Sequence, residues 1–322
     1  MDIVRDGQTL SVDVLPLRSR HAYQVSIAGE SEMVPVQVIV GPRRRPCLAL
    51  VAGVHGNEYE GMVTLAEFHR SLEPGALEGS LIVIPVANPF AFGAGQRRTP
   101  QDDRDLNRVF PGAEAGTLSE RLAHRLCTSV LAAVDLVFTL HSAMADGVLS
   151  PWIEFLEGSS ALEQATYAAA LASGFPDLVA LPRLPGVLQT ALAERGVPVI
   201  EGEVGGQGTT TPENVAYYTA RVLAVARHAG VMAGAAHPET VRRPPPVWHL
   251  RGVDAETAGV FQRGIELRQT VNEGDLLGTL LDIRDGSSRE VRSPAAGMIG
   301  GHRIHAGVRA RDRLVTLWEP AG

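Results

Sequence analysis

Short apolar runs alternate with longer amphipathic segments through most of this chain, and this alternation limits the fold more than any other feature. Five apolar runs have the length of strands, and several are apolar on both faces. Among the helical patterns, one has Thr117 three residues before Glu120, as in a capping box. This order predicts an α/β layer with a largely parallel sheet. The expected strands are 35–41, 47–54, 81–87, 136–140 and 198–204, and the expected helices are 58–72, 117–133, 161–174 and 213–230.

The composition changes near residue 233, and we therefore expect two domains joined by a linker. Residues 1–235 contain the alternating pattern and form the expected catalytic domain. Residues 236–250 are rich in proline, alanine and charge, which is typical of a linker. Residues 251–322 consist of short apolar segments separated by turns, and they predict a smaller all-β domain. A chain of 322 residues is long enough for this arrangement.

The chain contains no lysine, since all 29 basic residues are arginines. Schiff-base chemistry, pyridoxal phosphate attachment and the P-loop lysine are therefore excluded. The segment 273–301 resembles the hammerhead of lipoyl and biotinyl carriers, which need a lysine at a hairpin tip. We accordingly expect this part of the chain to be a lid or an oligomer contact and not a carrier arm.

Charge and composition exclude several classes of partner. The net charge of -7 and the pI near 5.8 argue against a nucleic-acid surface. The apolar runs are far shorter than the roughly 18 residues of a membrane helix, and the first residues do not resemble a secretory signal. Cys47 and Cys127 are the only cysteines, which fits a reducing compartment and excludes a thiolate zinc site. We expect a cytoplasmic protein that binds neither nucleic acid nor membrane.

Polar residues follow three of the expected strands where each strand ends. His55 and Glu58 come after the second strand, His141 directly follows the fourth, and Glu203 lies at the end of the fifth. Ligands of open α/β sheets bind beyond the carboxyl ends of the strands. Two histidines and a carboxylate form the ligand set of a catalytic zinc site, which leaves a fourth position for water.

His55 and Glu58 alone are a weak indication of metal, because one such pair arises readily by chance and also suits the start of a helix. Gly53 and Gly56 flank the histidine and strengthen the zinc interpretation. Glycine permits the sharp turn and the close backbone approach that a site at a strand end requires.

The long irregular segment 88–112 is a second candidate for function. It is rich in arginine, aspartate and asparagine, as a solvated surface loop can also be. Long loops without secondary structure are, however, more often functional than idle. Asn107 and Arg108 offer an amide and a guanidinium fork, which suit a substrate carboxylate.

Four motifs in this order resemble the succinylglutamate desuccinylase and aspartoacylase family, a branch of the zinc carboxypeptidase clan. They are "GVHGNEYEG", "DLNRVFPG", "LHSA" and "EVGGQG". The resemblance covers nearly the whole chain. It implies a zinc-carboxypeptidase-like, mixed and largely parallel sheet flanked by helices, followed by an all-β domain that packs beside the site and restricts it to small substrates.

The resemblance also implies the metal site. His55, Glu58 and His141 match the three ligands of one zinc ion per chain. Glu203 matches the glutamate that activates the zinc-bound water and then protonates the leaving amine. Glu201 is the nearby competitor for this role, and the match to "EVG" favours Glu203.

The remaining positions of the family pattern concern the substrate. Arg97 matches an arginine that polarises the scissile carbonyl, with Arg98 as the adjacent alternative. Asn107 and Arg108 match the pair that holds the substrate's carboxylate. Asp105 matches an aspartate that orients a zinc-bound histidine.

The function implied is that of a zinc-dependent amidohydrolase, which deacylates a small carboxylate-bearing N-acyl amino acid or related amide by zinc-hydroxide attack with a glutamate as general base. One alternative is a metallocarboxypeptidase acting on short peptides. The other is a relative that binds its ligand without turnover. The acyl group and the oligomeric state stay open, and a homo-oligomer is among the possibilities.

The chain departs from the family pattern at Thr139, where many relatives carry an acid. We expect a small change in the charge around the metal and no loss of the metal. Trp152 and Glu154 follow the segment of the third ligand, and the pattern leaves open whether they line the pocket.

Overall fold

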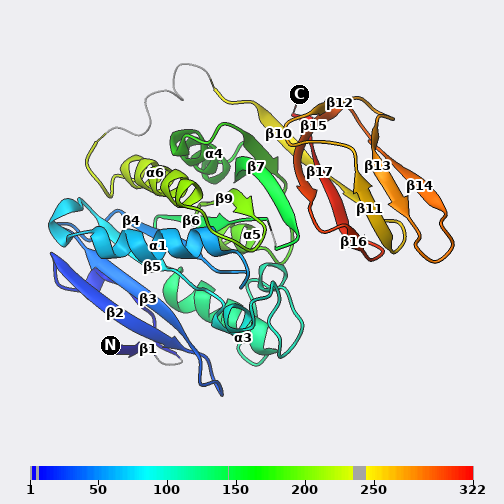
Figure 1. The fold of residues 1–322 in the computed structure, drawn as a ribbon. Coiled ribbons are helices and arrows are strands. Elements are labelled where there is room, and N and C mark those ends of the chain that lie inside the picture. Colours follow the sequence, from blue (N-terminus) through cyan, green and yellow to red (C-terminus); the bar gives the residue numbers. More distant parts are fainter. Residues whose placement is uncertain (1, 5–6, 144, 235–243, 322) are drawn as a thin grey trace.

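The structure is a computed structural model that describes residues 2–4, 7–143, 145–234 and 244–321. Most strands belong to one mixed sheet whose order is β1-β2-β3-β5-β4-β6-β9-β7-β8-β10-β17-β15-β12 (Figure 1). Its strands, in chain order, are β1 (Asp2–Val4), β2 (Ser19–Ser26), β3 (Met33–Val40), β4 (Cys47–Ala52), β5 (Ser80–Ile84), β6 (Leu136–His141), β7 (Gly147–Leu156), β8 (Leu178–Leu181), β9 (Val199–Gly206), β10 (Val247–Asp254), β12 (Thr270–Val271), β15 (Gly297–Arg303) and β17 (Arg313–Pro320).

The predicted α/β layer is confirmed, with helices on both faces of the sheet (Figure 1). One face is covered by α1 (Tyr59–Ser71), α4 (Ala161–Ser173) and α6 (Pro212–His228), which pack on one apolar core. The other face carries α3 (Leu118–Arg125) and α5 (Leu188–Ala193). A short helix, α2 (Pro89–Ala94), lies in the irregular segment after β5. The expected strands and helices all form, within a few residues of the predicted bounds.

Parallel pairing is confined to parts of the sheet. The strands β5, β4, β6 and β9 are parallel neighbours, as the alternation with helices predicts. Beyond them, β7 pairs antiparallel with β9, and β2 and β3 form an antiparallel hairpin beside β5. The sheet is therefore mixed, and its parallel part holds the strand ends where polar residues were predicted to gather.

The C-terminal strands extend the main sheet and also form a second one. β15 pairs with β7, so the C-terminal region is hydrogen-bonded directly to the strand beside β9. The second sheet shares an apolar core with β12, β15 and β17 and contains β11 (Gly259–Arg263), β13 (Leu276–Leu281), β14 (Ser288–Arg292) and β16 (Gly307–Val308). The division into 1–235, a linker 236–250 and 251–322 stays a prediction. Residues 236–243 lie outside the described residues, and β10 already begins at Val247.

A buried charge connects the C-terminal region to the α/β part. Asp177 is fully buried at the start of β8 and accepts hydrogen bonds from Trp248 Nε1 at 2.9 Å and Arg268 Nη1 at 2.6 Å. Trp318 stacks on Trp248 and packs edge-on against Trp152. These contacts join the C-terminal region to β7, through Trp152, and to the start of β8, through Asp177. Within the described part of the chain, no helix has both the length and the apolarity needed to cross a bilayer.

Candidate metal centre

The turn between β4 and α1 places the first two candidate ligands. β4 ends at Ala52, and Gly53 reverses the chain with a φ of +66°. A Cβ on Gly56 would lie 2.0 Å from the backbone carbon of Ala91, so only glycine fits at that approach. The structure thus confirms the sharp turn predicted at Gly53 and the close backbone approach predicted at Gly56. His55 and Glu58 consequently point back over the end of the sheet.

The three predicted ligands converge on one point. His55 Nδ1 lies 2.7 Å from Glu58 Oε1, and His141 Nδ1 lies 3.0 Å from Glu58 Oε2. One ligand atom from each residue falls within 4.8 Å of the others, and all three side chains are buried. His141 is the last residue of β6, and so the ligands come from the carboxyl ends of two adjacent parallel strands. An edge of this kind is where ligands of α/β sheets bind.

The outer nitrogen of each histidine faces another carboxylate. His55 Nε2 lies 3.1 Å from Asp105 Oδ1, and His141 Nε2 lies 3.4 Å from Glu201 Oε1. A carboxylate at Nε2 favours the tautomer that leaves the Nδ1 lone pair free. Both Nδ1 atoms face Glu58, so the donor set is two imidazole nitrogens and one carboxylate around a shared position. This set fits a zinc ion.

The electrostatics favour positive charge at the centre. Burial alone would raise the pKa of Glu58, but the charges of His55 and His141 and their hydrogen bonds hold it well below the usual range. Burial opposes ionisation of His141 too, yet its contacts with Glu201 and Glu58 raise its pKa well above the usual value. The carboxylates thus stabilise a cation at this point, as a metal site requires.

Arg97 points toward this centre and Arg98 does not. Arg97 Nε donates to Asp105 Oδ2 at 2.9 Å, and its Nη1 lies 3.4 Å from Glu58 Oε1. Arg98 is exposed and donates to the backbone carbonyl of Asp103 at 2.9 Å. Although burial opposes it, the contacts of Asp105 with His55 and Arg97 hold the pKa of its carboxyl well below the usual range.

Asn107 and Arg108 lie together on a single helical turn, Leu106–Arg108, but in different surroundings. Asn107 is buried: its Oδ1 accepts from the Leu188 backbone N–H at 2.8 Å, and its Nδ2 donates to Glu201 Oε1 at 3.4 Å. Arg108 is exposed and forms no ion pair with any acid among the described residues. Its Nη1 donates to the backbone carbonyl of Asn107 at 2.6 Å, and the guanidinium has no acidic partner among the described residues.

Strand register explains how the acids beyond the ligands are arranged. On β6 and β9, Thr139 pairs with Glu201 and His141 with Glu203, and on β9 and β7, Glu201 pairs with Glu154. Residues opposite one another, and residues two apart on one strand, point to the same side of a sheet. We refer to the side that carries these five residues as the site face.

The two glutamates of β9 differ in their contacts. Glu201 Oε1 accepts from Thr139 Oγ1 at 3.3 Å besides its contacts with His141 and Asn107. Glu203 Oε2 is buried and has no hydrogen-bond partner among the described residues. Burial, followed by the negative charge of Glu58, raises the pKa of Glu203 well above its usual range.

The sequence pattern leaves open whether Glu154 lines the pocket. In the structure, its register with Glu201 places it on the site face. Its side chain is half-buried, and Trp152 Nε1 donates to its Oε1 at 2.9 Å. Burial and the negative charge of Glu201 raise the pKa of Glu154 to about 7. The alternating pattern of 152–156 is the only sequence feature that could have indicated this position, because register with β9 is a tertiary property.

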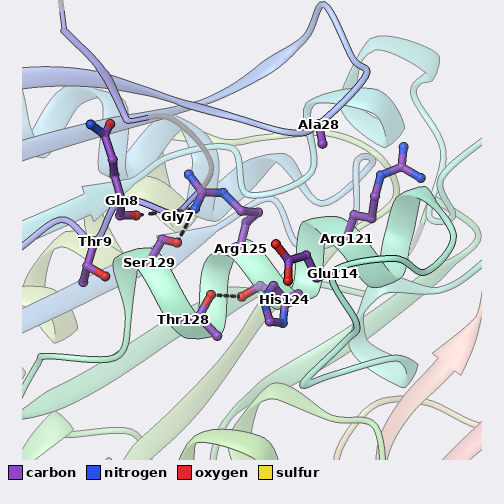
Figure 2. Close-up of a pocket in the computed structure, with 10 residues that line it drawn as sticks. All are labelled: Gly7, Gln8, Thr9, Ala28, Glu114, Arg121, His124, Arg125, Thr128 and Ser129. Carbon is purple, nitrogen blue, oxygen red and sulfur yellow. Dashed lines mark hydrogen bonds between the residues drawn. The ribbon is translucent and has the colours of Figure 1, made fainter.

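A separate cavity of about 270 Å³ lies between α3 and the N-terminal segment, away from the metal centre (Figure 2). Arg125 crosses its floor, and its Nη1 donates to Ser129 Oγ. None of the predicted site residues contributes to it. It is lined by Gly7, Gln8, Thr9, Ala28, Glu114, Arg121, His124, Arg125, Thr128 and Ser129.

Comparison with known proteins is consistent with this geometry. Residues 44–229 match the model of the succinylglutamate desuccinylase/aspartoacylase catalytic domain. The chain is 28% identical to N-alpha-acetyl-L-2,4-diaminobutyric acid deacetylase of Halomonas elongata, over 89% of this chain and 86% of that protein.

Two solved structures share the fold over nearly their whole length. The product-bound ectoine utilization protein EutE (DoeB) of Ruegeria pomeroyi is 26% identical, with a TM-score of 0.85 over 95% of this chain and 97% of that one. A succinylglutamate desuccinylase/aspartoacylase of Rhodobacter sphaeroides is 27% identical, with a TM-score of 0.83 over 94% and 96%. The C-terminal strands are thus included in the similarity.

Proposed function

Because the chain belongs to the succinylglutamate desuccinylase/aspartoacylase family, we propose that it is a zinc-dependent amidohydrolase that deacylates a small N-acyl amino acid bearing a carboxylate. The observation that carries the proposal is the convergence of His55, Glu58 and His141, whose ligand atoms lie within 4.8 Å of one another. The similarity to a deacetylase over 89% of the chain supports hydrolysis of an amide.

The proposed zinc would be held by Nδ1 of both histidines and by the carboxylate of Glu58. When bound, zinc acts as a Lewis acid and lowers the pKa of a water molecule to about 7. Asp105 and Glu201 face the outer nitrogens of His55 and His141 and fix the orientation of the two rings.

Glu203 is the proposed general base. Its unpartnered Oε2 supports this role, whereas Glu201 is engaged by Thr139, Asn107 and His141. Glu203 takes a proton from the attacking water as the new C–O bond forms. It delivers that proton to the amide nitrogen as the C–N bond breaks, so that a carboxylic acid and an amine are released.

Two arginines are proposed to stabilise negative charge, one on the carbonyl oxygen during the reaction and one on the carboxylate of the substrate. Arg97, held by Asp105, is placed to donate to the carbonyl oxygen as charge develops on it. Arg108 has no acidic partner among the described residues and is the proposed ligand of the substrate's carboxylate. Asn107 supports it, since the contacts of its amide with Leu188 and Glu201 hold the turn in place.

The test combines metal content with turnover. We expect the purified protein to bind one zinc per chain, to lose hydrolysis on chelation and to regain it with zinc. Glu203→Gln should retain zinc and lose about 10²–10⁴-fold in kcat, the usual contribution of a general base. The exposed Glu194→Gln serves as the control and should behave like the wild type.

The substrates should include acetyl, succinyl and formyl amino acids, N-alpha-acetyl-L-2,4-diaminobutyrate and short peptides. Faster cleavage of peptides would favour a carboxypeptidase. Binding of these compounds without turnover, in the presence of zinc, would favour a non-catalytic relative. Full activity in a rigorously metal-free protein would overturn the proposal.

A further inference from the structure

Glu154 is an acidic residue of the site face that the proposed reaction does not use. It lies on β7, directly opposite Glu201 on β9, and next to the Trp152–Glu203 pair. The register places its Cα two strands away from Thr139 of β6, a separation of about 10 Å at the usual strand spacing. Its Cα therefore lies two strands away from β6, the strand that carries His141, and a small substrate can bridge this spacing.

Every other acid around the centre has a defined partner or task. Glu58 contacts both histidines, Asp105 is paired with Arg97, and Glu201 contacts His141. For Glu154 the only hydrogen bond among the described residues comes from the indole of Trp152, and no arginine forms an ion pair with it there. The Trp152 contact fixes the direction of the carboxylate but supplies no positive charge.

A second observation indicates that a ligand fills this part of the site. Glu203 Oε2, on the same face, is buried without a hydrogen-bond partner among the described residues. Arg108 is linked to the same face through its neighbour, because Asn107 Nδ2 donates to Glu201 Oε1 at 3.4 Å and Glu201 lies opposite Glu154. Arg108 and Glu154 thus offer one positive and one negative group beside the candidate metal centre. Such a pair suits a ligand that carries both a carboxylate and an ammonium group.

We propose that Glu154 determines specificity by binding an ammonium group on the side chain of the substrate, so that the preferred substrates are N-acyl derivatives of diamino acids. The inference rests on the proposed function and deepens it. Arg108 receives the carboxylate, the amide carbonyl lies toward the histidines, and the side-chain ammonium reaches the carboxylate of Glu154. A neutral side chain of the same length leaves the half-buried Glu154 carboxylate without a cationic partner, which is costly.

The test compares matched pairs of substrates that differ only in the ammonium group. The pairs are the N-alpha-acetyl derivatives of L-2,4-diaminobutyrate and L-norvaline, and of L-ornithine and L-norleucine, in which a methyl replaces the ammonium. For the zinc-loaded wild type we expect kcat/KM to favour the cationic member of at least one pair by tenfold or more. In Glu154→Gln the ratio within that pair should fall at least tenfold, mainly through KM. The exposed Glu157→Gln is the control and should keep the wild-type ratio.

Binding of the free diamino acids provides a second measurement. Calorimetry should give a Kd for L-2,4-diaminobutyrate or L-ornithine at least tenfold lower in the wild type than in Glu154→Gln. Equal kcat/KM for charged and neutral members in the wild type would refute the inference and leave the deacylase proposal intact. An unchanged ratio in a folded Glu154→Gln would refute it as well. Absence of all hydrolysis, together with equal binding of L-norvaline and the diamino acids, would overturn both proposals.

Discussion

Gly61 is the position where one added methyl group should push apart the two elements that position the candidate metal ligands. It lies in the first turn of α1, three residues after Glu58, and faces β4, which precedes His55, and β6, which ends at His141. A Cβ at this position would lie 2.7 Å from Leu140 Cβ, 2.8 Å from Leu140 O and 3.1 Å from Ala52 Cβ. Leu140 directly precedes His141, so Gly61→Ala pushes the helix that carries Glu58 away from the strand of the third ligand.

The size of the effect follows from these distances. Carbon atoms in contact prefer about 3.5–4.0 Å, so α1 and β6 must separate by about 1 Å. Overpacking of this kind costs about 1–3 kcal/mol, and the better helix propensity of alanine returns up to about 1 kcal/mol. We expect a net loss of about 1–2 kcal/mol in the free energy of unfolding. A shift of about 1 Å also exceeds the roughly 0.2 Å tolerance of a zinc site, and we expect zinc affinity to fall by at least about tenfold.

Urea unfolding of the metal-free protein gives the first quantity, and competition with a chromophoric chelator gives the zinc affinity. Gly93→Ala is the matched control, because it lies in α2 and an added Cβ meets no atom within 4 Å. It should keep the wild-type affinity and be unchanged or slightly more stable. The reasoning is refuted if Gly61→Ala unfolds at the wild-type urea concentration and binds zinc as tightly as the wild type.

Two further predictions concern buried groups. The single proton of the buried Tyr218 hydroxyl is shared between the backbone carbonyls of His141 and Gly202, so Tyr218→Phe should lose about 1–3 kcal/mol in urea unfolding. Tyr217→Phe, whose hydroxyl has no hydrogen-bond partner among the described residues, should lose little, and equal losses in the two variants would contradict this account. Burial raises the pKa of Cys47 and of Cys127 to about 12. Both thiols therefore stay protonated in the folded protein at pH 8 and should react with a thiol reagent only after unfolding; fast labelling of the native protein would show that they are exposed.

The buried parallel strands of this fold can be predicted from the sequence, whereas β7 cannot. The doubly apolar runs of β4, β5 and β6 could be recognised because both faces of these strands are covered by helices. β7 contains Pro151, which argues against a strand inside a sheet. The structure accommodates the proline at a break in register between Leu149 and Trp152, where the ladder is irregular. Such a break depends on the neighbouring strands and has no local pattern.

The candidate site shows the same division between local and tertiary information. His55 and Glu58 are three residues apart, and their turn is specified by nearby glycines, so a local pattern could indicate them. His141 comes to them through the parallel pairing of β4 with β6, which the alternation of strands and helices predicts. Glu154 comes to the site through antiparallel pairing with β9, and no motif marks that register.

The position of Glu201 explains how the chain accommodates Thr139, where the family pattern predicts an acid. Thr139 lies on β6, two residues before His141, and pairs directly with Glu201 on β9. The Glu201 carboxylate accepts from the Thr139 hydroxyl at 3.3 Å and lies 3.4 Å from His141 Nε2. A negative charge thus faces the outer nitrogen of the histidine from the adjacent strand. Glu203 lies two pairs further along the same ladder, opposite His141, and its unpartnered Oε2 is consistent with a different task. A spacing of two residues therefore separates an acid that contacts a candidate metal ligand from the proposed general base, although both lie on the site face.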